Sequence, residues 1–345
     1  MSEMRRVYIS ADMEGVTGVV SQEDVTPGRL NYERFRKLMT QDVNAAIEGA
    51  IDAGADEVLV NDSHGEMRNI LIEELHPKAS LISGFNKPLY MMEGIDQNFD
   101  CVFFIGYHSM VGGRGVLSHT FSGASRVLLN GRPTSEGEVN AMIAGYFGVP
   151  VTMVSGDQHT VSEIKEVLGE SVEGAVVKHA IDRYSARCLH PSVTREIIKK
   201  AAYRAFLKAK QISPYKPKPP ITLEFEFLQP SMASRAAYLP FVEQLDARTV
   251  RVSANDAISA WRLFGVRYYL DEARKKRGIK GNVQESARRS LPTRFDFLCF
   301  GLSGLRRQTS QALQLLLCFI VEQSQAIRRR ELEDRFFRVE QVEAR

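Results

Sequence analysis

The chain has 345 residues, 44% of them apolar and 25% charged, which is the composition of a soluble globular protein with room for two domains, each with its own core. Its longest apolar run, residues 315–321, is far shorter than the roughly 18 residues of a membrane span, and the charged residues 1–6 do not resemble the start of a signal peptide. Four widely spaced cysteines indicate neither a zinc knuckle nor a disulfide framework, so we expect a cytoplasmic protein.

The net charge of +3 is unevenly distributed. Residues 1–273 contain 29 Lys and Arg against 34 Asp and Glu, whereas residues 274–345 contain 16 against 8. This change predicts a separate basic, Arg-rich tail over 274–345, whose pattern fits both an oligomerisation helix and a poorly ordered appendage. The tail lacks interleaved aromatic residues and a recognisable module, so we expect neither nucleic acid nor a membrane as a partner.

Short apolar strands alternate with amphipathic helices along the rest of the chain. In chain order, the pattern predicts a strand at 7–9, a helix at 31–53, strands at 57–60, 81–84 and 101–105, a hairpin at 127–132, a helix at 135–146, a strand at 150–154 and a helix at 192–210. A strand, a helix and a second strand over this length form a βαβ unit with parallel strands. We therefore predict an α/β fold with a largely parallel sheet and flanking helices.

The prolines suggest how the chain is divided. Four of them fall within residues 214–220 and predict a stiff linker. It would separate a catalytic, metal-binding α/β domain, residues 1–213, from a small α/β lobe, residues 221–273. Strands at 222–227 and 249–253 and a helix at 257–273 are predicted in the lobe, and the tail, predicted to be helical, would follow.

Several predicted elements carry potential metal ligands where they begin or end: Asp12 and Glu14 after the strand at 7–9, His64 after 57–60, His108 after 101–105, and Glu136 at the start of the helix at 135–146. Parallel strands present their carboxyl ends at one edge of the sheet, where ligands bind, so these side chains should share a crevice. Taken singly, Asp12 and Glu14 also fit a turn or a capping role, and Glu136 fits an ordinary acid of a first helical turn.

Three carboxylates and two imidazoles, without cysteine, suit Zn²⁺, Mn²⁺ or Co²⁺. Five ligands are too many for one open tetrahedral zinc and suit two metal ions that share a bridging carboxylate and activate a water. The residue pattern thus predicts a hydrolytic metal site. The glycine-rich loop at 112–115 lacks the spacing of a dinucleotide site, and neither a G-x-S-x-G nor an H-E-x-x-H motif occurs.

The candidate ligands belong to a longer ordered series of short motifs. They are Ser10-Ala11-Asp12-Met13-Glu14-Gly15, Val60-Asn61-Asp62-Ser63-His64, Leu81-Ile82-Ser83-Gly84, Gly106-Tyr107-His108, Ser118-His119, Asn130-Gly131-Arg132-Pro133 with Glu136 and Asn140, Ser155-Gly156-Asp157, Val177-Lys178 and Cys188-Leu189. On these motifs the chain resembles the zinc-dependent D-aminopeptidases of the DppA type over about residues 5–273.

The resemblance implies roles for particular residues. Asp12 would bridge two Zn²⁺ ions, and the remaining ligands would be Glu14, His64, His108 and Glu136. His119 matches the family's catalytic histidine, for which proton transfer or transition-state stabilisation is chemically easier to defend than nucleophilic attack. The family's α/β domain with a smaller lobe assembles into a ring-based decamer with an inner channel, which implies short peptides as substrates.

We therefore expect a dinuclear zinc aminopeptidase that uses a metal-bridging hydroxide to release N-terminal amino acids from short peptides or amino-acid amides; the D-preference rests on the resemblance alone. The alternatives are an L-aminopeptidase or dipeptidase with the same site, a dinuclear metal phosphoesterase aided by Arg114, Arg126 and Arg132, and a non-catalytic peptide-binding protein. One departure from the family is Glu138 in place of glycine, a carboxylate that would either alter binding of the substrate amine or point to solvent.

Overall fold

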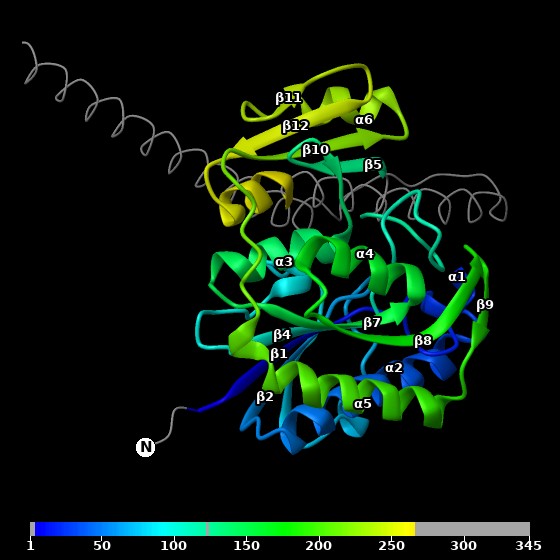
Figure 1. The fold of residues 1–345 in the computed structure, drawn as a ribbon. Helices are drawn as coiled ribbons and strands as arrows, with labels where there is room; N and C mark the ends of the chain where they lie inside the picture. The colour runs from blue at the N-terminus through cyan, green and yellow to red at the C-terminus, as the bar shows by residue number, and fades with distance from the viewer. Residues whose placement is uncertain (1–3, 122–123, 266–345) are drawn as a thin grey trace, which may run out of the picture. The chain divides into compact units, whose positions relative to one another are not determined.

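A computed structural model describes residues 4–121 and 124–265 of the chain (Figure 1). The predicted helical tail, residues 274–345, therefore lies outside the described residues. Two sheets organise the described part: a seven-stranded sheet in the order β3-β2-β1-β4-β7-β8-β9, and a five-stranded sheet in the order β11-β12-β10-β5-β6.

The strands of the first sheet are β1 (Arg6–Ala11), β2 (Glu57–Asp62), β3 (Ala79–Ile82), β4 (Cys101–Ile105), β7 (Val151–Asp157), β8 (Glu173–Asp182) and β9 (Ser185–Cys188). All neighbouring pairs are parallel except β8 with β9, which form an antiparallel hairpin at one edge. The predicted fold class, a largely parallel α/β sheet, is confirmed. Because every crossover in a parallel sheet returns the chain to the same end, the carboxyl ends of β1, β2 and β4 lie together.

Helices cover both faces of this sheet. They are α1 (Gln22–Val25), α2 (Tyr32–Asp52), α3 (Glu136–Tyr146), α4 (Gln158–Leu168) and α5 (Pro191–Leu207), with short 3₁₀ turns at Ile72–Glu74, Tyr90–Met92 and Ala209–Gln211. In Figure 1, α3 and α4 lie on one side of the sheet and α2 and α5 on the other.

The alternation of side chains along β1 explains why the sheet needs cover on both faces. Val7 and Ile9 pack into the core that contains α2 and α5, whereas Tyr8 between them packs into the core that contains α3 and α4. All three side chains are fully buried, as the period-two geometry of a strand between two helical layers requires.

The second sheet is antiparallel throughout. It consists of β5 (Ala124–Leu129), β6 (Arg132–Pro133), β10 (Ile221–Phe227), β11 (Glu243–Gln244) and β12 (Thr249–Ala254), with α6 (Pro230–Ala236) beside β10 and β12 and a further helix that starts at residue 257. Its strands come from both sides of the predicted linker at 214–220, since β5 and β6 precede it. The domain boundaries we placed there remain a prediction.

Candidate metal centre

The loops that leave β1 and β4 lie against each other at the carboxyl edge of the sheet. Asp12 N donates a hydrogen bond to Ile105 O at 2.8 Å, and Gly15 N donates to Gly106 O at the same distance. A Cβ atom at Gly15 would lie 1.9 Å from Tyr107 O, so this approach of two backbones needs glycine. The glycine after the two acids thus brings the Asp12 loop to the His108 loop.

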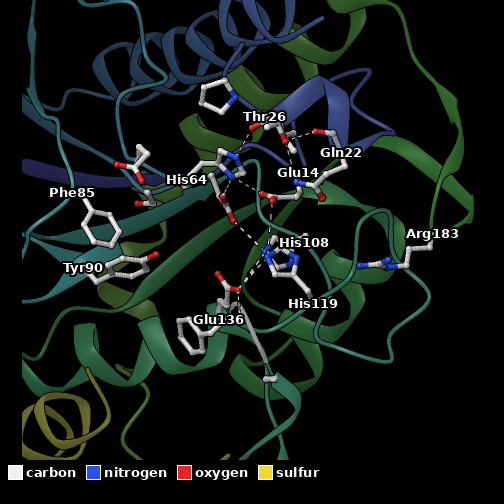
Figure 2. A pocket seen from close by; sticks show the side chains of 18 residues that line it. Glu14, Gln22, Thr26, His64, Phe85, Tyr90, His108, His119, Glu136 and Arg183 are labelled. Atoms are coloured by element: carbon white, nitrogen blue, oxygen red, sulfur yellow. Dashed lines mark hydrogen bonds and ion pairs between the residues drawn. The ribbon is translucent and has the colours of Figure 1, made fainter. Parts of the chain in front are cut away.

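All six predicted site residues line one pocket of about 440 Å³ (Figure 2): Asp12, Glu14, His64, His108, His119 and Glu136. The side chains of Asp12, Glu14, His108 and Glu136 are at most 8% exposed, and that of His119 is 34% exposed. The structure therefore brings together every residue that the sequence indicated, with His119 at the open side of the cluster.

The Asp12 carboxylate lies between two pairs of side chains. Its Oδ1 is 3.3 Å from Nδ1 of His64, and that nitrogen is 3.0 Å from Oε2 of Glu14. Its Oδ2 is 3.4 Å from Nε2 of His108, and that nitrogen is 3.7 Å from Oε1 of Glu136. Asp12 Oδ2 is buried and accepts no hydrogen bond from the described residues, an unfavourable state for a carboxylate oxygen that a cation would relieve.

Each imidazole is held by a backbone carbonyl. Nε2 of His64 lies 2.9 Å from the carbonyl oxygen of Val25, Nδ1 of His108 lies 2.9 Å from that of Ser109, and Nδ1 of His119 lies 2.8 Å from that of Leu117. Because a carbonyl oxygen only accepts, these nitrogens carry the hydrogen and the opposite nitrogens face the carboxylates. Ligand histidines in metal sites are oriented in this way.

The electrostatics of the cluster favour positive charge. Burial by itself would lower the pKa of His108, but Glu136 and Asp12 raise it to about 10. Burial and the charge of Glu14 together raise the pKa of Asp12 to about 7. Buried carboxylates that crowd one another are stabilised by a divalent cation.

The donor atoms are also close enough for metal ions. Two triplets have ligand atoms that lie within 4.8 Å of one another: Asp12, Glu14 and His108, and His108, His119 and Glu136. Nitrogen and carboxylate donors without thiolates fit zinc or a similar divalent ion. His119 belongs to one triplet, and its ring stacks on His108 at a centroid distance of 4.1 Å.

The loop that carries His119 has a constrained backbone. Leu117 and Phe121 both have positive φ, +51° and +49°, which is uncommon for residues with large side chains. Phe121 N donates to Oε1 of Glu136 at 2.7 Å, and Leu117 N donates to the carbonyl oxygen of Arg183 at 2.8 Å. Contacts on both sides thus fix His119 next to Glu136.

Glu138 neither lies in the pocket, where it could contact the substrate amine, nor points to solvent, the two alternatives expected from the sequence. It does not line the pocket, and it is only 2% exposed. Its carboxylate accepts hydrogen bonds from the hydroxyls of Tyr215 at 2.6 Å and Thr134 at 2.7 Å. Arg132, which we had considered for phosphate binding, lies 3.3 Å from it. Glu138 is therefore a structural anchor for the segment after α5.

The arginines considered for a phosphoesterase do not line the pocket. Arg126 pairs with Glu226 at 3.3 Å, and Arg114 is absent from the lining. Two other basic residues near the site were given no role from the sequence, although Val177-Lys178 is one of the motifs shared with the family. Lys178 is fully buried and donates to the carbonyl oxygens of the loop after β1, and Arg183 lines the pocket. Neither role could be predicted from the local sequence, because both contacts join segments far apart in the chain.

The fold and the mixed cluster of carboxylates and imidazoles define an α/β protein with a candidate hydrolytic metal centre at the carboxyl edge of its sheet. The family model for D-aminopeptidases, peptidase family M55, matches residues 4–266, and the chain belongs to this family. The predicted resemblance and the predicted class, a metallo-aminopeptidase, are thereby confirmed.

Two relatives show how far the likeness extends. The chain is 38% identical to a D-aminopeptidase of Bacillus subtilis (strain 168) over 258 residues, which cover 74% of this chain and 94% of the relative. It is also similar to the solved structure of the Zn-dependent D-aminopeptidase DppA from Bacillus subtilis, described as a self-compartmentalizing protease. That comparison gives a TM-score of 0.74 and 37% identity, and covers 77% of this chain and 97% of the other.

Proposed function

We propose that this protein is a dinuclear zinc aminopeptidase that removes N-terminal D-amino acids from short peptides or amino-acid amides. The observation that carries the proposal is the position of Asp12 between two pairs of donors, with Glu14 and His64 on one side and His108 and Glu136 on the other. A carboxylate so placed is suited to bridge two cations, and its Oδ2, which accepts no hydrogen bond from the described residues, supports this role.

Zinc bound there would act as a Lewis acid on the scissile carbonyl and lower the pKa of a water. The protein's own contribution is orientation: the carbonyls of Val25 and Ser109 fix the two ligand imidazoles so that their free nitrogens face the carboxylates. His119 is suited to proton transfer. Burial and the neighbouring His108 lower its pKa, which keeps the imidazole neutral and able to accept a proton near pH 7.

The charge of the pocket supports a peptidase over a phosphoesterase. Among the described lining residues are four carboxylates, those of Asp12, Glu14, Glu66 and Glu136, and one Arg or Lys side chain, that of Arg183. Asp12, Glu14 and Glu136 are proposed metal ligands, whose charge bound zinc would offset. Beside the metals a phosphate dianion would have Arg183 as its one protein cation among these lining residues, and the free α-ammonium group of a peptide would have Glu66.

Hydrolysis of paired D- and L-alanyl peptides by the purified, zinc-loaded protein tests the proposal. We expect release of the N-terminal residue from the D-peptide, loss of activity with loss of zinc in Asp12→Ala, and loss of activity with zinc retained in His119→Ala. Activity of Asp12→Ala equal to that of the wild type would overturn the proposed mechanism. Preference for the L-peptide would overturn the stereochemical part alone, and loss of zinc in His119→Ala would make His119 a ligand.

We also infer that the protein forms a homo-oligomer, with the decamer of the resembling family as the expected size. The self-compartmentalizing character of the Bacillus subtilis DppA supports this inference. Light scattering coupled to size-exclusion chromatography tests it, and a monomer at micromolar concentration would contradict it.

No helix of the described residues is long and apolar enough to cross a membrane.

A further inference from the structure

Arg183 lies in the turn between β8 and β9 and is bonded to the loop that carries His119. Its backbone carbonyl oxygen accepts a hydrogen bond from Leu117 N at 2.8 Å, and its Nε donates to Ser118 O at 3.2 Å. These two bonds place the guanidinium beside the proposed catalytic histidine, although 64 residues separate Arg183 and His119 in the sequence.

The guanidinium group is available for an anionic partner. Arg183 is an exposed residue, and its side chain contacts the ring and hydroxyl of Tyr184 and the backbone of Ser118. Among the described residues no carboxylate is paired with this side chain. Arg183 is also the one described pocket residue with a permanent positive charge, in a pocket otherwise rich in carboxylates.

The pocket is asymmetric around the metal cluster. Figure 2 shows the Arg183 guanidinium directed toward His119 from one side, whereas Phe85 and Tyr90 lie on the opposite side. With Phe121, these two rings form an aromatic part of the lining. A peptide bound across the cluster would have an apolar wall near one end and a cation near the other.

We propose that Arg183 binds the C-terminal carboxylate of the substrate and thereby makes the enzyme selective for very short peptides with a free carboxyl end. The inference rests on the proposed aminopeptidase function. Arginine pairs with carboxylates through two parallel N–H···O bonds, which fix both position and orientation. A dipeptide spans about 7 Å, so a carboxylate held next to His119 would lie one residue beyond the scissile bond.

Two substrates that differ in a single group test the proposal: D-alanyl-D-alanine and its C-terminal amide. We expect Arg183→Gln to raise KM for the free acid about 10- to 100-fold, because the substrate loses a charge-assisted hydrogen bond. KM for the amide and kcat for both substrates should stay within about 2-fold of the wild type. Arg183→Lys should recover part of the preference for the acid, because it keeps the charge without the bidentate geometry.

Arg187→Gln is the matched control, since Arg187 is exposed on β9 of the same hairpin and does not line the pocket. It should leave the acid-to-amide ratio unchanged. An equal fall in kcat for both substrates in Arg183→Gln would show that Arg183 only holds the His119 loop, and an unchanged ratio would also overturn the inference. A wild-type enzyme inactive on both peptides would refute the proposed function and this inference with it.

Discussion

Lys178 holds the loop between β1 and α1, the loop that presents Glu14 to the pocket. Its side chain is fully buried, and its Nζ donates to the carbonyl oxygens of Glu14 at 2.6 Å, Val16 at 3.0 Å and Val19 at 2.7 Å. Lys178→Met keeps most of the volume and removes all three donors, so it tests how far the loop depends on this one amine.

The size of the effect follows from two opposing contributions. Without Lys178 the buried carbonyl oxygens of Glu14 and Val19 have no donor, which destabilises the folded state by about 2 kcal/mol each. Val16 O keeps the hydrogen bond from Val19 N at 3.2 Å and loses only its second donor, at a cost of about 1 kcal/mol, so the sum is about 5 kcal/mol. Burial lowers the pKa of Lys178 from 10.5 to about 8. The buried ammonium therefore destabilises the folded state by about 3 kcal/mol at pH 7, and replacing it with methionine removes this penalty. We therefore expect a net loss of about 2 kcal/mol in the free energy of unfolding at pH 7.

Urea unfolding of the metal-free protein measures this loss. Competition with a chromophoric chelator measures the zinc affinity, which should fall about 10- to 100-fold because the Glu14 loop is no longer fixed. Lys200→Met is the control, since that side chain is 70% exposed on α5. A loss below about 1 kcal/mol together with unaltered zinc affinity would refute the reasoning, because neither outcome is compatible with two orphaned buried acceptors and a released Glu14 loop.

Three further predictions concern residues other than the proposed metal ligands. Burial raises the pKa of Asp42 to about 6, so the folded state binds the extra proton between about pH 4 and 6. The free energy of unfolding should therefore fall by up to about 3 kcal/mol as the pH rises through that window. Urea titrations of Asp42→Asn at several pH values should lack this decline. The same pH dependence in Asp42→Asn and the wild type would contradict the prediction. Glu138→Ala removes the acceptor of the Tyr215 hydroxyl and should lower the free energy of unfolding in urea by about 2–4 kcal/mol. Because Glu138 does not line the pocket, kcat/KM should be unchanged. A tenfold loss of kcat/KM would contradict the structural role. Deletion of the chain after Ala273 should leave peptide hydrolysis intact, because the family match ends at residue 266. A truncated protein that is folded but inactive would show that the tail contributes to the site.

Much of the site could be predicted because it follows the geometry of parallel sheets. Apolar segments at 7–9, 57–60 and 101–105 identify strands, and the residues just after them must lie along one edge. The structure extends two of these strands, since β1 runs to Ala11 and β2 to Asp62, but this changes no side chain's place in the pocket. Local hydrophobic pattern and one topological rule were enough for Asp12, Glu14, His64 and His108, whereas the role of His119 came from the family resemblance.

The parts that were missed depend on tertiary contacts. β8 contains Lys178 and His179, which break the apolar pattern of a buried strand, and yet Lys178 is fully buried because distant carbonyls bind its amine. Arg183 is an ordinary turn residue by sequence and gains its place only through the His119 loop. The helix α4 was not predicted, although Asp157 is a favourable N-cap residue and accepts hydrogen bonds from the amides of His159 and Thr160.

Backbone carbonyls orient side chains of the proposed metal centre. The carbonyls of Val25, Ser109 and Leu117 orient the three imidazoles. Val25 ends α1, which follows the loop held by Lys178, and Ser109 and Leu117 lie in loops that other contacts fix. A main-chain carbonyl cannot be removed by an ordinary substitution, so mutations disturb the imidazoles only by moving the loops. Grafting the five proposed ligands and His119 onto another α/β sheet would therefore reproduce these side chains without their orientation. A graft without these loops should bind zinc weakly.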